Sequence, residues 1–303
     1  MSRLRLQPFD PGWPLGLSDL GQLAERYAVR SLWVEGELPA LPGVAVVGAR
    51  RAGASGQEAA RRIGADLGRR GVTVVSGFAR GIDAGAHRGC LSAGGRTLAV
   101  LGCGLDVDYP SQHAALRRDV AASGALITEY EADDPPVSWR FPRRNRIIAA
   151  LARAVVVVEA GVESGALSTA RWAAELGREV LAVPGAILGP ANQGSNRLLR
   201  DGARPYLDSS DLADLFPECG APPPLSGDRK VPRERDGRPS TGADNGPAAA
   251  RLLALVGAEP VPRELVARAL GLGASDLAVL LGELELVGSV RSLPGGLVAR
   301  AAW

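Results

Sequence analysis

The sequence has almost no lysine: Lys230 is the only one in 303 residues, and arginine carries nearly all of the positive charge. Because Lys230 lies in a polar stretch, no lysine is available for a Walker-type phosphate loop or for a Schiff base, which excludes those two classes of enzyme. A GC-rich genome would produce the same arginine bias, so the bias alone does not indicate a nucleic-acid ligand.

Cysteine and long apolar runs are also scarce. Cys90, Cys103 and Cys219 are odd in number and lack CxxC spacing, which argues against a disulfide framework or a zinc module and favours a reducing compartment. The N-terminal residues have no apolar signal core, and no apolar run is long enough to span a bilayer. We therefore expect a cytoplasmic protein with no membrane partner.

The charge of the chain is nearly balanced, with a formal net charge of +2, so affinity for an anionic ligand requires a local basic patch. Residues 135–147 provide a candidate, because they contain four arginines, Trp139 and Phe141 and no acidic residue. Four arginines on one helix cannot all face one way, so some are expected to pair internally. Exposed guanidinium groups beside aromatic rings suit the phosphates and bases of a single strand of nucleic acid.

Six apolar, β-branched segments alternate with helical patterns between residues 44 and 216. The expected strands are residues 44–47, 72–75, 97–101, 125–128, 155–158 and 180–183, and the expected helices lie near residues 56–70, 82–93, 111–123, 143–152 and 166–177. This alternation predicts the α/β class, with a doubly wound, mostly parallel, Rossmann-like sheet. Ligands of such sheets bind beyond the carboxyl ends of the strands.

A change in composition separates a second domain. Residues 217–247 are polar and rich in proline and glycine, which predicts a flexible linker. Three expected helices (248–256, 263–270 and 275–287) and a hairpin with a Pro-Gly-Gly turn (290–299) then predict a small winged-helix domain. The predicted organisation is a short N-terminal extension (1–40), the Rossmann-like domain (41–216), the linker (217–247) and the winged-helix domain (248–303).

Several loops at predicted strand ends could hold phosphate. Arg50 follows the first expected strand, Ser76, Gly77 and Arg80 follow the second, and Ser164 and Gly165 precede an expected helix. For each of these positions a surface or helix-capping role is the alternative. Asp83 and His87 are only two candidate ligands, so a metal is not expected; we predict that Asp83 caps a helix and that His87 bonds to backbone.

Taken in order, these motifs resemble the DNA-processing protein A family, also called DprA or Smf. The matching segments are Val46-Val47-Gly48-Ala49-Arg50, Ser76-Gly77-Phe78-Ala79-Arg80-Gly81-Ile82-Asp83 with Ala86-His87, Leu101-Gly102-Cys103-Gly104-Leu105-Asp106 with Tyr109-Pro110, Phe141-Pro142-Arg143-Arg144-Asn145-Arg146-Ile147-Ile148, Glu159-Ala160 with Ser164-Gly165-Ala166-Leu167, and Arg178-Glu179-Val180 with Val183-Pro184-Gly185. Each motif alone is weak, but the set is specific.

The resemblance implies a protein that binds single-stranded DNA, protects it and brings it to the RecA recombinase in natural transformation, with DNA repair as a second setting. It also implies a homodimer formed through the Rossmann-like domain, no catalytic residue and no cofactor. The residues that fall on the family's pocket motifs are Arg50, Ser76, Gly77, Arg80, Phe141, Arg143, Asn145 and Arg146.

The chain departs from the family pattern in two places. Only about forty residues precede the first expected strand, where many members carry a helical domain. The presumed recognition helix of the tail contains Asp276, Glu283 and Glu285 and no basic residue, so we expect the tail to contact a protein or to be structural.

Two other functional classes remain open. The sheet architecture also resembles nucleotide phosphoribohydrolases of the lysine-decarboxylase-like fold, but their P-G-G-x-G-T-x-x-E signature is absent from residues 162–169. The other class is a structural hub whose sheet binds nothing.

Overall fold

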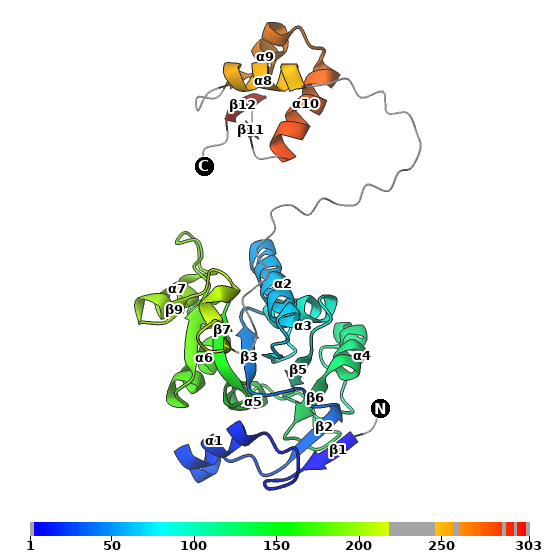
Figure 1. Ribbon diagram of the computed structural model, residues 1–303, viewed down its shortest axis with the longest axis vertical. Coiled ribbons are helices and arrows are strands. Elements are labelled where there is room, and N and C mark those ends of the chain that lie inside the picture. Colours follow the sequence, from blue (N-terminus) through cyan, green and yellow to red (C-terminus); the bar gives the residue numbers. More distant parts are fainter. Residues whose placement is uncertain (1–2, 218–245, 257–260, 287–288, 294–295, 301–303) are drawn as a thin grey trace. The chain divides into compact units, whose positions relative to one another are not determined.

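The computed structural model describes residues 3–217, 246–256, 261–286, 289–293 and 296–300 (Figure 1). The described residues form two compact units, divided between residues 227 and 228. The predicted linker, 217–247, lies almost wholly outside the described residues, as do positions 294 and 295 of the predicted Pro-Gly-Gly turn.

The first unit is built on one nine-stranded sheet with the order β1-β2-β6-β5-β4-β3-β7-β8-β9. Its strands are β1 (Arg3–Leu6), β2 (Leu32–Gly36), β3 (Gly43–Val47), β4 (Val74–Ser76), β5 (Thr97–Val100), β6 (Ala125–Thr128), β7 (Ala152–Val157), β8 (Glu179–Ala182) and β9 (Arg204–Pro205). The pairs in the run β6-β5-β4-β3-β7-β8-β9 are parallel, whereas the pairs β1-β2 and β2-β6 are antiparallel. The predicted doubly wound sheet is confirmed.

Helices cover both faces of this sheet. They are α1 (Ser18–Leu23), α2 (Ala54–Arg69), α3 (Ile82–Ser92), α4 (Ala114–Ser123), α5 (Arg140–Ala150), α6 (Ala166–Glu175) and α7 (Gln193–Arg200). Alternate residues of β3 show why: Ala45 and Val47 pack with α5 and α6, whereas Val44 and Val46 pack with α2 and α3. A strand that is buried on both faces reads as a continuous apolar run, which is why the sequence revealed it.

The N-terminal residues differ from the prediction. Residues 1–40 were expected to precede the first strand, but they contribute β1 and β2, and β2 pairs with β6 at the edge of the main sheet. Leu17 and Leu20 of this segment belong to the same buried cluster as Ile147 of α5. The segment is therefore part of the first unit.

The second unit contains α8 (Gly246–Leu255), β10 (Val261–Pro262), α9 (Arg263–Leu270), α10 (Ala274–Leu286), β11 (Val290–Leu293) and β12 (Leu297–Arg300). The strands form a small sheet with the order β10-β12-β11. Leu252, Val266 and Leu280 form a core with Val298, so the helices pack on the sheet as a winged helix requires. In neither unit is a described helix both long enough and apolar enough to cross a membrane.

Candidate nucleic-acid interface

A cleft of about 1010 Å³ lies at the carboxyl ends of the parallel strands. It is lined by the loops that follow β3, β4 and β7 and by the first turns of α5. Strand β3 has β4 on one side and β7 on the other, so the cleft lies where the strand order reverses. This switch point is where doubly wound sheets bind their ligands.

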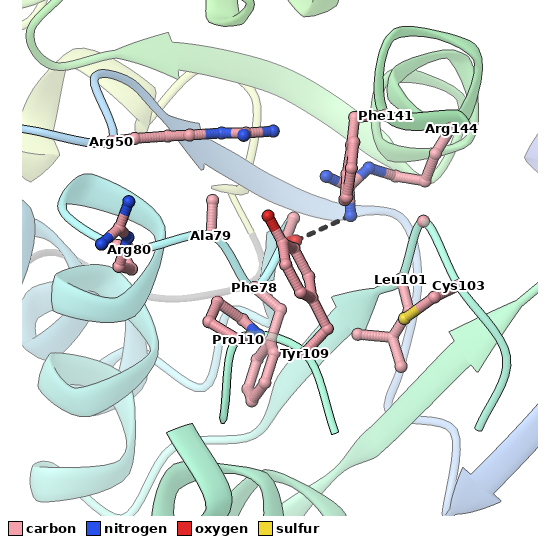
Figure 2. Close-up of a pocket in the computed structure, with 12 residues that line it drawn as sticks. Arg50, Phe78, Ala79, Arg80, Leu101, Cys103, Tyr109, Pro110, Phe141 and Arg144 are labelled. Carbon is pink, nitrogen blue, oxygen red and sulfur yellow. Dashed lines mark hydrogen bonds between the residues drawn. The ribbon is translucent and has the colours of Figure 1, made fainter. Parts of the chain in front are cut away.

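Arg50 and Arg80 come from two different loops and both line the cleft. Both also line a smaller pocket that adjoins it (Figure 2). The loops are in direct contact, because Ile82 N donates a hydrogen bond to Ala49 O at 3.2 Å. Gly81 allows this approach: its φ is +74°, and a Cβ there would lie 2.3 Å from Ala49 O. Both arginines are exposed, and within the described part of the chain neither pairs with a carboxylate.

Two aromatic rings lie beside Arg50. The Phe141 ring is 5.4 Å from the Tyr109 ring, centroid to centroid, and the Arg50 guanidinium lies 4.9 Å from the Phe141 centroid. Both rings also line this smaller pocket, which reaches Phe78 and Cys103. The cleft therefore offers positive charge and flat apolar surface together. Tyr109 was not among the predicted contacts, although its motif was noted.

Arg144 forms the floor of the cleft and was missed as a site residue. It is 3% exposed. It donates hydrogen bonds to Gly77 O at 2.7 Å and to Val100 O, while the Asp83 carboxylate accepts from Gly77 N at 3.1 Å and from Ala79 N at 3.2 Å. The peptide groups of Gly77 are thus held on both sides, which fixes the loop that carries Arg80.

Burial sets the electrostatics of this floor. It lowers the pKa of Arg144 to about 10, so the guanidinium remains charged at neutral pH. Burial also raises the pKa of Asp83, an effect that Arg144 and the two N–H donors oppose. Each group favours the charged form of the other, which opposes the effect of burial on both pKa values.

Asn145, Ser164 and Gly165 also line the cleft. Asn145 Nδ2 donates to Gly165 O at 3.1 Å and to Ser168 Oγ at 2.7 Å, so it holds the loop after β7 against α5. Ser164 Oγ accepts from Ala166 N at 3.4 Å, which is a local contact at the start of α6. Gly77 lines the adjoining pocket.

Two residues predicted to contact DNA have side chains that are buried outside the cleft. Ser76 is fully buried and its Oγ donates to Val46 O at 2.6 Å. Arg146 is 1% exposed and makes a bidentate ion pair with Glu129 at 2.6 and 2.7 Å. Arg143 is half-exposed and lies 3.9 Å from Glu129, but it does not line the cleft. Not all arginines of this segment face the cleft, as expected.

The contacts predicted for Asp83 and His87 are wrong, although both side chains are buried. Asp83 binds the preceding loop and does not cap α3. His87 Nδ1 lies 2.7 Å from Thr97 Oγ1, so its partner is a side chain and not backbone. Burial lowers the pKa of His87 to about 3. The described residues contain no group of three or more potential metal ligands.

The fold and this cleft define a doubly wound α/β protein with a basic, aromatic-lined site at its switch point and a winged-helix unit after it. The chain belongs to the DNA recombination-mediator protein A family, whose model matches residues 5–217. A model described as the DprA winged helix domain matches residues 236–296.

Individual relatives agree with this assignment. Protein Smf of Escherichia coli is 38% identical to this chain, over 88% of this chain and 71% of the length of Smf. A putative DNA processing protein DprA of Mycobacterium tuberculosis is 43% identical, over 73% of this chain and 52% of the length of that relative. The chain thus spans about half the length of the mycobacterial relative.

Solved structures of the family have the same fold. DNA processing protein A of Streptococcus pneumoniae superposes with a TM-score of 0.64 at 34% identity, covering 71% of this chain and 74% of that one. The Helicobacter pylori protein, whose structure concerns a single-stranded DNA binding mode, superposes with a TM-score of 0.63 at 26% identity, covering 72% and 97%.

Proposed function

We propose that this protein binds single-stranded DNA in the cleft at the switch point of the sheet. One observation carries the proposal: Arg50 and Arg80 converge from separate loops beside Phe141 and Tyr109, and no described carboxylate neutralises either arginine. Guanidinium groups can hold phosphates, and the rings can stack on unpaired bases. Duplex DNA keeps its bases stacked internally and so gains only the phosphate contacts.

The proposed contacts are revised by the geometry. Arg50, Arg80 and Phe141 remain as direct contacts, with Tyr109 added, and Gly165 and Ser164 remain as backbone neighbours of a phosphate. Arg143 is exposed on another face of α5 and remains a proposed contact for a longer strand. Gly77 and Asn145 hold the loops in place.

Family membership supports a proposal for the biological role. We propose a non-enzymatic mediator that protects incoming DNA and delivers it to the RecA recombinase in natural transformation, with DNA repair as a second setting. The protein would act in the cytoplasm as a homodimer formed through the Rossmann-like unit, without a cofactor. Support comes from the family model and from the relative whose structure concerns single-stranded DNA binding.

For the winged-helix unit, we propose a protein partner. Asp276, Glu283 and Glu285 are exposed on α10, and this acidic surface does not suit the major groove of DNA.

The test is binding of labelled oligonucleotides, measured by fluorescence anisotropy. We expect tighter binding of a single strand than of duplex of equal length, at both low and moderate salt. Equal affinity for the two forms, or no binding of either, would contradict the proposal.

Incubation with nucleoside monophosphates tests the phosphoribohydrolase alternative, for which release of free base is required.

A further inference from the structure

The first turn of α2 follows β3, at the first crossover of the sheet. In doubly wound proteins this helix start is a common place for a phosphate, because its backbone N–H groups and the helix dipole favour an anion. Here a side chain already lies there. Glu159, which follows β7, accepts a hydrogen bond from Gly53 N on Oε1 at 3.1 Å, and only 5% of Glu159 is exposed.

The surrounding backbone is shaped around this carboxylate. A Cβ at Gly56, in the first turn of α2, would lie 2.3 Å from Glu159 Oε2, and a Cβ at Gly48 would lie 2.8 Å from Glu159 O. Ala49 N also donates to Glu159 O at 2.7 Å. The carboxylate therefore fills the space in which a phosphate would contact the helix start.

The start of α6 provides a contrast at the same cleft. Gly165 and Ala166 line the cleft, and a Cβ at Gly165 would have nothing within 4 Å. Glu159 does not line the cleft. Of these two helix starts, one is open to a ligand and the other is closed by an internal anion.

We propose that Glu159 is a specificity-determining residue that excludes phosphate from α2. With this position filled, the phosphate of a mononucleotide or of a DNA end has no backbone site there, and anionic ligands are left to the side chains of Arg50 and Arg80. The part of this inference that concerns DNA rests on the proposed function. The exclusion of phosphate from α2 stands independently of it.

The experiment compares wild type with Glu159→Ala and Glu159→Gln. Alanine vacates the position, whereas glutamine keeps its volume and an oxygen that can accept from Gly53 N. Thermal unfolding is measured in inorganic phosphate and in chloride at equal ionic strength. We expect phosphate to raise the Tm of Glu159→Ala by several degrees and to leave the other two proteins unchanged, because a ligand of the folded state stabilises it.

The inference is overturned if Glu159→Ala folds and its Tm responds to phosphate no more than that of wild type. If Glu159→Ala does not fold in chloride, its refolding in inorganic phosphate is measured in place of the Tm comparison. Recovery in phosphate alone supports the inference, and failure in both solutions overturns it.

Oligonucleotide binding separates this inference from the proposed function. We expect Glu159→Ala to bind an internal single-stranded segment within about twofold of wild type, because Arg50 and Arg80 are unchanged. A loss greater than this would show that Glu159 supports DNA binding directly, which overturns its assignment as an excluding residue. Absence of binding by wild type would contradict the proposed function and leave the phosphate result standing.

Discussion

Replacement of Arg50 by alanine removes one positive charge from the cleft without disturbing the fold. Arg50 is exposed and has no carboxylate partner among the described residues, so the free energy of unfolding should change by less than about 0.5 kcal/mol. Its guanidinium rests against the Phe141 ring at 4.9 Å. This contact restrains the side chain before DNA arrives, so little rotamer entropy is lost on binding.

The magnitude follows from the loss of one phosphate contact. Because Arg50 is exposed, its contact should be worth ~1 kcal/mol, less than the ~1.5–3 kcal/mol of hydrogen bonds to charged groups in general. Loss of this contact raises the Kd about fivefold. For a single strand, each neutralised phosphate contributes ~0.7 to the slope of log K against log salt. A fourfold rise in salt should therefore weaken wild type ~2.6-fold more than Arg50→Ala.

Anisotropy titrations of a labelled single strand at two salt concentrations measure both quantities. Arg62→Ala is the matched control, because Arg62 is also an exposed arginine but pairs with Glu58 on α2, away from the cleft. The reasoning is refuted if Arg50→Ala and wild type share the same Kd and the same salt slope. It is equally refuted if Arg62→Ala loses as much affinity as Arg50→Ala.

Three further predictions concern the rings and the buried groups. Phe141→Ala should cost ~1–3 kcal/mol in binding a single strand and little in binding duplex, as titrations of both forms would show. Arg144→Met should lower the free energy of unfolding by ~3–5 kcal/mol in urea, because buried Asp83 loses the nearby positive charge that favours its carboxylate. Burial lowers the pKa of His87 from 6.5 to about 3, so only the unfolded chain gains a proton as the pH falls below 6.5. Stability should then decline toward pH 3 by at most ~1.4 kcal/mol per pH unit, a slope that His87→Gln removes.

Each of these has a clear contrary result. Equal losses on single strand and duplex would show that Phe141 does not stack on bases. If Arg144→Met has the same free energy of unfolding in urea as wild type, buried Asp83 does not depend on the Arg144 charge. An unchanged pH slope in His87→Gln would place the titrating group elsewhere.

The central strands could be predicted because burial on both faces leaves a continuous apolar run. The two N-terminal strands could not, since Arg3-Leu4-Arg5-Leu6 alternates at an edge where only Leu6 is buried. Such a short alternation is identified only by its pairing with β2. The residues that create that pairing lie about thirty positions away in the chain.

For the site, the sequence indicated the arginine-rich segment but not its helical phase. The predicted helix began at residue 143, whereas α5 begins at Arg140. With the observed start, Phe141, Arg144, Asn145 and Ile148 share the face that lines the cleft. Their spacing of three and four residues follows from the α-helical repeat. The rotation of α5 about its own axis decides which arginines face the cleft, and adjacency in sequence carries no such information.

The opposite face of α5 explains why so few arginines act at the cleft. Arg143 and Arg146 are three residues apart and both lie near Glu129, while Arg140 pairs with Asp134. These carboxylates lie outside the arginine-rich segment in sequence, so that segment looks more basic than the surface it forms. The positive field of the cleft therefore comes mainly from loops after β3 and β4. Arg144 and Asp83 fix the loop after β4 through Gly77 and Ala79. The hydrogen bond from Ile82 N to Ala49 O joins that loop to the one after β3, so two buried side chains help to determine where the exposed charges lie.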